Sequence, residues 1–87
     1  MIETIWKYLL QPGHNMFEVP AHSHIVHVGC DPNGDPAAWY QVVEGVETRE
    51  EELMVVGTGH DFDGKAWEYH SSIHQGPFVW HVLTVMG

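Results

Sequence analysis

The residues best suited to chemistry follow an apolar run near the middle of the chain. Residues 53–56 are apolar, and Gly57-Thr-Gly-His60 comes next, followed by Asp61 and Asp63. Imidazole nitrogens and carboxylate oxygens are the groups with which proteins hold zinc. A histidine beside a hydroxyl or a carboxylate can also act as a general base. This corner is therefore the first place to look for a metal site or an active site.

A metal site needs three or four ligands that converge on one point, and the sequence supplies only fragments of one. His22 and His24 are two residues apart, so both would point to one side of a strand. The chain has no HExxH or CxxC motif, and the aspartates of the corner lack the closing glutamate of a calcium-binding EF-hand loop. We expect no metal and no cofactor. If a metal does bind, the candidate ligands are His22, His24, His60, Asp61 and Asp63.

Nucleophilic catalysis has equally little support in the sequence. Cys30 is the only cysteine, and neither it nor the pair Ser71 and Ser72 stands in a pattern that marks an activated nucleophile. The short Gly57-Thr-Gly59 segment lacks the lysine and the following helix of a phosphate-binding loop. We therefore assign no catalytic residue and expect a protein that is not an enzyme.

The corner has a simpler structural interpretation. Gly57 and Gly59 allow the positive φ angles of a sharp turn, and His60 would cap that turn or form a hydrogen bond to it. In this interpretation Gly57, Gly59 and His60 mark a turn in the fold and have no part in a reaction.

The charge of the chain argues against several classes of partner. The 87 residues include 12 acidic and only 3 basic ones, which gives a formal net charge of −9 at pH 7. Such a chain repels nucleic acid phosphates and anionic membranes, so we expect neither direct nucleic acid binding nor membrane binding. An acidic surface can instead dock onto a basic partner, and Glu50, Glu51 and Glu52 are the candidates for it.

Four tryptophans point to either a packed core or a binding surface. Aromatic residues are enriched at the energetic centres of protein interfaces. We predict that Trp39 and Trp80 belong to the core, and that Trp6 and Trp67 are available for interaction. A hydrophobic share of 44% indicates a folded globule, and we treat residues 1–87 as a single domain.

Short apolar segments alternate with turn-forming residues along the chain, which predicts an all-β, mainly antiparallel domain. We expect a small sandwich or open barrel of six to seven short strands with at most one short helix. The expected strands are residues 2–10, 16–19, 22–29, 37–44, 48–57, 65–74 and 78–86. Residues 11–15 are expected to break the chain between the first two strands.

Three of these segments carry more detailed expectations. Asn33-Gly34 favours a tight hairpin that pairs residues 22–29 with 37–44. Residues 48–57 could also begin a helix, because Thr48 and Glu51 match a capping box, but Val55 and Val56 favour a strand. Residues 78–86 are apolar on both faces, as expected of a central strand or of one that faces a second subunit.

Period-two alternation predicts which side chains of two strands share a face. In residues 22–29, one face would hold His22, His24, Val26 and Val28, and the other Ile25 and His27. In residues 65–74, the core would receive Trp67, Tyr69 and Ile73. Solvent would receive Glu68, His70 and His74. A loose loop with one helical turn is the alternative for this second segment.

Six short segments together resemble a family of small, uncharacterised proteins of tailed bacteriophages. They are Thr4-Ile-Trp-Lys-Tyr8, Glu18-Val-Pro-Ala21, Ile25-Val-His-Val28, Ala38-Trp-Tyr-Gln-Val-Val43, Val56-Gly-Thr-Gly-His60 and Phe78-Val-Trp-His-Val82. The resemblance implies a phage-encoded product that acts in the cytoplasm of a bacterial host, and it brings no activity with it. This chain differs from the family pattern in having more histidine and a longer, more acidic segment at residues 44–52.

These observations favour a non-enzymatic phage accessory protein that binds, and modulates, a host protein through an acidic or aromatic surface. A self-associating structural or assembly protein is the first alternative, motivated by the apolar segment 78–86. A metal-binding protein or hydrolase that uses the His60 region is the second. The lone cysteine and the lack of a signal peptide or apolar span agree with a cytoplasmic location.

Overall fold

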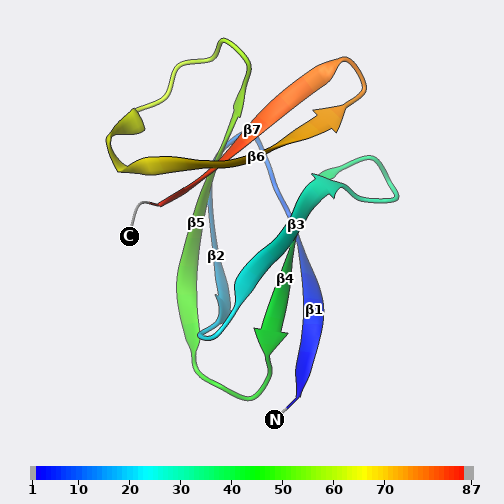
Figure 1. Cartoon of the computed structure of the whole chain (residues 1–87), viewed down its shortest axis with the longest axis vertical. Helices are drawn as coiled ribbons and strands as arrows, with labels where there is room; N and C mark the ends of the chain where they lie inside the picture. Colours follow the sequence, from blue (N-terminus) through cyan, green and yellow to red (C-terminus); the bar gives the residue numbers. More distant parts are fainter. Residues whose placement is uncertain (1, 86–87) are drawn as a thin grey trace.

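The protein folds as an open sandwich of two antiparallel β-sheets, as the computed structural model shows for residues 2–85 apart from the side chain of Lys65 (Figure 1). This confirms the predicted all-β class, with two sheets that do not close into a barrel. Among residues 2–85 the only helical segment is a single 3-10 turn, η1, so no helix could cross a membrane. The elements are β1 (Glu3–Leu9), β2 (Gly13–Pro20), β3 (His24–Cys30), β4 (Pro36–Val43), β5 (Thr48–Gly57), η1 (Gly64–Ala66), β6 (Trp67–Gln75) and β7 (Phe78–Val85).

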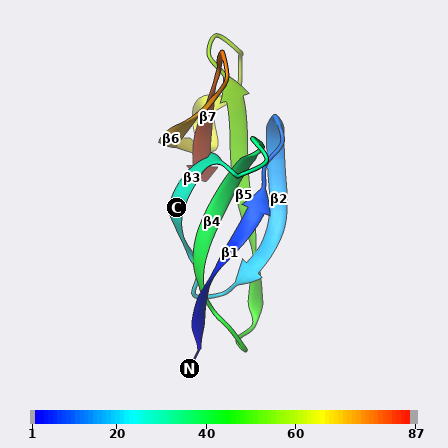
Figure 2. The same cartoon turned by 90° about the vertical axis from the view of Figure 1, so that its right-hand side faces the viewer.

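The two sheets have the strand orders β1-β4-β3 and β2-β5-β7-β6. In Figure 2, β1 and β4 of the first sheet run alongside β2 and β5 of the second. The sandwich is thin, with principal extents of 42 × 32 × 15 Å. β7 lies between β5 and β6, which confirms its prediction as a central strand, although Met86 lies outside the described residues. β5 is a strand over its whole length, so the alternative helix is wrong.

The core lies between the sheets and is centred on Tyr40 of β4. Tyr8 of β1 stacks on Phe17 of β2 with ring centroids 4.6 Å apart, and both rings meet Tyr40 edge-on. These contacts join the two sheets through aromatic rings, which bury large apolar areas and stabilise the core. The buried residues of this core are Leu10, Val19, Val28, Ala38, Tyr40, Val42, Leu53, Val55, Ile73 and Val82.

A β-bulge in β3 changes which residues of this strand face the core. The pairing with β4 shifts between Ile25 and His27, which leaves Val26 as the extra residue, 47% exposed. Ile25 and Val28 therefore both face inward, opposite Tyr40 and Ala38, and His27 faces outward opposite Trp39. The predicted alternation is wrong because an inserted residue reverses the faces of everything beyond it. His22 precedes the strand and lies in a turn.

A second bulge has the same effect in β6. The pairing with β7 shifts between Tyr69 and Ser71, so that His70 is the extra residue. Ile73 is buried as predicted, at 1% exposure. Trp67 and Tyr69 pair with Val85 and Leu83 on the outer face, so their predicted inward orientation is wrong.

Two turn predictions also need correction. The predicted break at residues 11–15 is shorter, because β2 already begins at Gly13, where φ is +97°. The hairpin between β3 and β4 forms as predicted, but residues 31–35 make a longer loop in which Gly34 alone has positive φ. The Asp31 carboxylate organises this loop by accepting the backbone N–H groups of Asn33 and Asp35 and the Lys7 ammonium, the last at 2.9 Å.

The Asp31 carboxylate makes the stability of the domain pH-dependent. The N–H of Asp35 and then the Lys7 ammonium hold the pKa of Asp31 below its ordinary value of 3.8, although its burial acts in the opposite direction. A lowered folded-state pKa contributes stability that is present above the unfolded pKa and is lost as the pH falls through the folded one. We expect Asp31→Asn to lower the free energy of unfolding at pH 7, and the difference from the wild type to shrink below about pH 4.

Urea unfolding of both proteins at pH 7 and pH 3 measures this difference. Asp35→Asn is the matched control, because its side chain is exposed in the same loop and its backbone N–H is unchanged. A deficit of Asp31→Asn that is equally large at both pH values would contradict the role of the ionised carboxylate.

Candidate functional site

Three side chains from separate elements meet beside the corner that follows β5. Nε2 of His81, in β7, lies 2.6 Å from Oγ1 of Thr58, and Nδ1 lies 3.0 Å from the hydroxyl of Tyr69, in β6. A neutral imidazole carries one N–H, so it donates to one of these hydroxyls and accepts from the other. The result is a continuous chain of hydrogen bonds from the corner across two strands.

This chain resembles a catalytic triad only in part. A histidine that accepts from a hydroxyl can activate it as a nucleophile. In a triad, however, a carboxylate on the other ring nitrogen stabilises the imidazolium that forms, and here a neutral phenol occupies that place. The arrangement thus suits recognition, because it presents polar groups at fixed positions, better than it suits acyl transfer.

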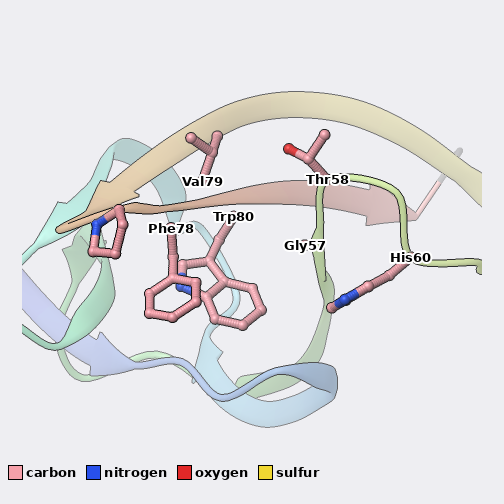
Figure 3. A pocket seen from close by; sticks show the side chains of 7 residues that line it. Gly57, Thr58, His60, Phe78, Val79 and Trp80 are labelled. Atoms are coloured by element: carbon pink, nitrogen blue, oxygen red, sulfur yellow. The ribbon is translucent and has the colours of Figure 1, made fainter.

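Shallow hollows adjoin His60, the residue after the two glycines. One of about 300 Å³ is lined by Gly57, Thr58, His60, Pro77, Phe78, Val79 and Trp80. In Figure 3 the rings of Phe78 and Trp80 lie side by side, and His60 projects toward the same hollow from the corner. A second hollow, of about 190 Å³, lies over Leu83 between Tyr69, His81 and Phe62. The first hollow is at the lower end of the size range of small-ligand sites, and the second is below it. Both are open to solvent on one side.

The outer face of the four-stranded sheet extends from this corner toward the acidic end of β5. His14 bonds to Glu52 at 2.9 Å and meets the Trp67 ring edge-on at 5.9 Å. Beyond them Met16 pairs with Glu52, and Glu18 pairs with Glu50. We call this the outer surface; it comprises His14, Met16, Glu18, Glu50, Glu52, Met54, Phe62, Trp67, Tyr69 and His81.

The predicted interaction residues do not all lie on the outer surface. Glu50, Glu52 and Trp67 belong to it. Trp6 lies in the other sheet, opposite Tyr40 in the register, and is 39% exposed. Of the tryptophans predicted for the core, Trp80 packs against it, whereas Trp39 lies half-buried on the outer face of the three-stranded sheet beside His27.

Glu51 faces the interior, unlike its two acidic neighbours. It accepts the hydroxyl of Tyr40 at 2.8 Å and the guanidinium of Arg49 at 3.0 Å. Burial of Tyr40, and then the adjacent Glu51 carboxylate, raise the pKa of this phenol far above its ordinary value, so it stays protonated and remains a donor. Arg49 also donates to the carbonyl oxygens of Ala21 and Ser23. The role of Glu51 is therefore to connect β5 with β4 and with the turn before β3.

The candidate metal ligands are divided between distant elements. His60, Asp61 and Asp63 lie in the corner. His22 lies in the turn before β3, and His24 begins that strand in the other sheet. Within residues 2–85 no three His, Cys, Asp or Glu side chains stand where they could hold one metal ion. The prediction that His22 and His24 share one face of a strand is wrong, because β3 begins only at His24.

The two glycines of the corner have different roles. Gly59 has φ of +87°, as predicted. Gly57 ends β5 without positive φ, and a Cβ added to it would meet the His60 ring at 2.9 Å. Gly57 is thus needed for the close approach of His60, and the backbone N–H of His60 closes the turn onto the Gly57 carbonyl at 3.0 Å.

Sequence reasoning missed Thr58, Tyr69 and His81 as a group. They come from a corner and two strands, and no spacing along the chain relates them. The bulge at His70 is what places Tyr69 on the outer face beside His81. The threonine between two glycines was the one local signal, because such a side chain stands clear of its neighbours.

Comparison with known proteins identifies a family. A family model described as "Domain of unknown function (DUF7352)" matches residues 1–86, almost the whole chain. No curated protein and no solved structure gives a significant match.

The Tyr40 hydroxyl is a buried donor to a carboxylate, so its removal has a measurable cost. We expect Tyr40→Phe to lower the free energy of unfolding by about 1.5–3 kcal/mol, the range for hydrogen bonds to charged groups. Urea unfolding at pH 7 measures it. Tyr8→Phe is the control, because it keeps the ring stacked on Phe17 and should cost less than about 0.5 kcal/mol. Equal losses for the two variants would show that the bond to Glu51 adds no stability.

The corner depends more on Gly59 than on His60. Gly59→Val should cost about 1–2 kcal/mol, because a β-branched residue at φ +87° is strained even though nothing lies within 4 Å of the added Cβ. His60→Ala removes an exposed ring and leaves the turn-closing backbone N–H in place, so it should cost under about 0.5 kcal/mol. Unfolding midpoints in urea compare the two, and coincident midpoints would contradict this account of the corner.

Proposed function

We propose that this chain, which belongs to the DUF7352 family of domains of unknown function, is a non-enzymatic module that binds a basic partner protein through its outer surface. The resemblance to small tailed-phage proteins supports a phage-encoded product whose partner is a protein of the bacterial host, met in the host cytoplasm. Binding at this surface would modulate the partner by covering the basic site that it contacts.

The observation that carries the proposal is the composition of the outer surface. Met16 is 52% exposed, Tyr69 57% and Phe62 45%, and Trp67 is half-buried between His14 and the end of β7. Aromatic residues and methionine are enriched in protein interfaces because they supply large contact areas at a low cost in conformational entropy. Exposed side chains of this kind, gathered on one face, are typical of a binding surface.

The acidic part of the same surface indicates the charge of the partner. Glu18 and Glu50 stand directly opposite each other on β2 and β5, and Glu52 follows on the same face. Like charges at facing positions destabilise a sheet. A lysine or arginine of a partner placed between them would remove this repulsion. The relief of the repulsion would add to the free energy of binding.

Lys7 and Arg49 do not neutralise this surface, because both are paired elsewhere. Lys7 pairs with Asp31 in the other sheet, and Arg49 pairs with Glu51 on the inner face. Neither cation therefore offsets the charge of the acidic row formed by Glu18, Glu50 and Glu52. This charge would guide a basic partner toward the aromatic residues beside it.

Capture from a bacterial lysate with matched variants tests the proposal. Tyr69→Ala removes an exposed aromatic residue of the outer surface, and Glu50→Lys reverses a charge on it. Leu9→Ala, 58% exposed on the other sheet, and Glu47→Lys, exposed in the turn before β5, are their controls. We expect a host protein that is retained by the wild type and both controls, and at least about tenfold less by the two surface variants.

The purified partner then allows a direct measurement. Its dissociation constant, measured by calorimetry, should rise steeply between 50 and 300 mM salt, because charge attraction is screened by salt. A partner retained equally by all variants, or no partner at low salt, would refute binding through this surface.

A further inference from the structure

Strand β1 is an edge strand whose outer side is uncovered. It is the first strand in the order β1-β4-β3, and within residues 2–85 it pairs with β4 alone. In Figure 1 it forms the margin of the molecule next to the N-terminus, and in Figure 2 it faces the viewer. Its side chains are exposed as well: Ile5 is 52%, Trp6 39% and Leu9 58% exposed.

The other edge strands carry bulges or flanking prolines, and β1 has neither. β3 and β6 contain the bulges at Val26 and His70, and β2 follows Pro12 and ends at Pro20. Bulges and prolines are the usual means by which proteins protect the edges of their sheets. β1 pairs with β4 without interruption from Glu3 to Leu9 and has no proline. It is thus the edge best prepared to accept another strand.

The free backbone groups of β1 belong to its odd-numbered residues. The carbonyl of Ile2 accepts from Glu44 and the N–H of Leu10 donates to Pro36, in the same register that pairs the strand between them. Even-numbered residues therefore bond to β4. Because these groups alternate in direction along an antiparallel strand, Glu3, Ile5 and Lys7 point their N–H and C=O groups to the open side.

We propose that two copies of the chain form a two-fold symmetric dimer in which β1 pairs antiparallel with β1 of the second copy, with the axis at Ile5. In this register the free groups of Ile5 bond to those of the other Ile5. Glu3 faces Lys7 of the second copy, and Lys7 faces its Glu3. The three-stranded sheets of the two copies then become one continuous sheet.

Charge selects this register among the symmetric ones. An axis at Glu3 or at Lys7 would bring two like charges face to face, and an axis at Thr4 or at Trp6 would leave Glu3 opposite an apolar residue. With the axis at Ile5, unlike charges face each other on both sides of an apolar pair, which is the favourable arrangement for facing residues. Among residues 2–85, Glu3 accepts from the Gln41 amide through one carboxylate oxygen, and Lys7 keeps donors besides the one used for Asp31, so both can make these contacts.

The dimer is tested first by mass. Sedimentation equilibrium from about 5 µM to 1 mM at 150 mM salt should give twice the monomer mass at the upper end. Glu3→Lys places Lys7 of the second copy opposite another lysine, and Ile5→Lys places two lysines at the axis. Each should raise the dimer dissociation constant at least about tenfold. Glu47→Lys makes the same change in net charge as Glu3→Lys away from this edge and should leave the constant unchanged.

The register is tested by a cross-link. Facing hydrogen-bonded residues have Cα atoms about 5.5 Å apart, within the reach of a disulfide. In a Cys30→Ser background, Ile5→Cys should give a covalent dimer under mild oxidation. Leu9→Cys, equally exposed on the same strand but off the axis, should give little. A monomer at every concentration, a dimer that both lysine variants leave intact, or equal cross-linking of the two cysteine variants would overturn the proposal.

Discussion

The sandwich depends on the burial of Tyr40 between its two sheets. This ring has no exposed surface, receives Tyr8 and Phe17 edge-on from opposite sheets, and donates its hydroxyl to Glu51 on β5. A molecule only 15 Å thick has room for a single layer of such side chains between its sheets. Each strand must therefore turn its apolar face inward, because no second layer of side chains could replace a core residue that faced outward. The aromatic contacts hold the sheets together, and the bond to Glu51 fixes which strands face each other.

The bulges mark the limit of what the sequence could predict. The number and approximate positions of the strands follow from apolar segments and turn residues. The assignment of Trp39 to the core was wrong even though β4 is regular, because this residue lies on the outer face of the three-stranded sheet. In β3 and β6 an inserted residue reverses the faces, and neither Val26 nor His70 differs chemically from a regular strand residue. The position of a bulge depends on the partner strand and on the curvature of the sheet, and both are set by residues distant in the sequence. Trp67 and Tyr69 were misplaced for this reason alone.

The same bulge creates the candidate site. Had β6 continued its alternation, Tyr69 would lie inside, and His81 would have only Thr58 beside it. The extra residue brings the phenol to the outer face, where it joins the imidazole and the threonine of the corner. The corner itself could be predicted from the sequence, because closely spaced glycines after an apolar run indicate a turn. The site was not visible because it depends on a register shift at His70, in a different strand from His81.

Net charge and local charge have opposite consequences for association. At −9, two copies of the chain repel each other at long range, and this repulsion is largely screened beyond about 8 Å at physiological salt. Strand β1 contains one acidic and one basic residue and so carries no net charge of its own. The surplus of acid lies elsewhere, in part on the outer face of the other sheet. Contact between copies through β1 and contact between a basic partner and the acidic row therefore use different sheets, and neither contact has to displace the other.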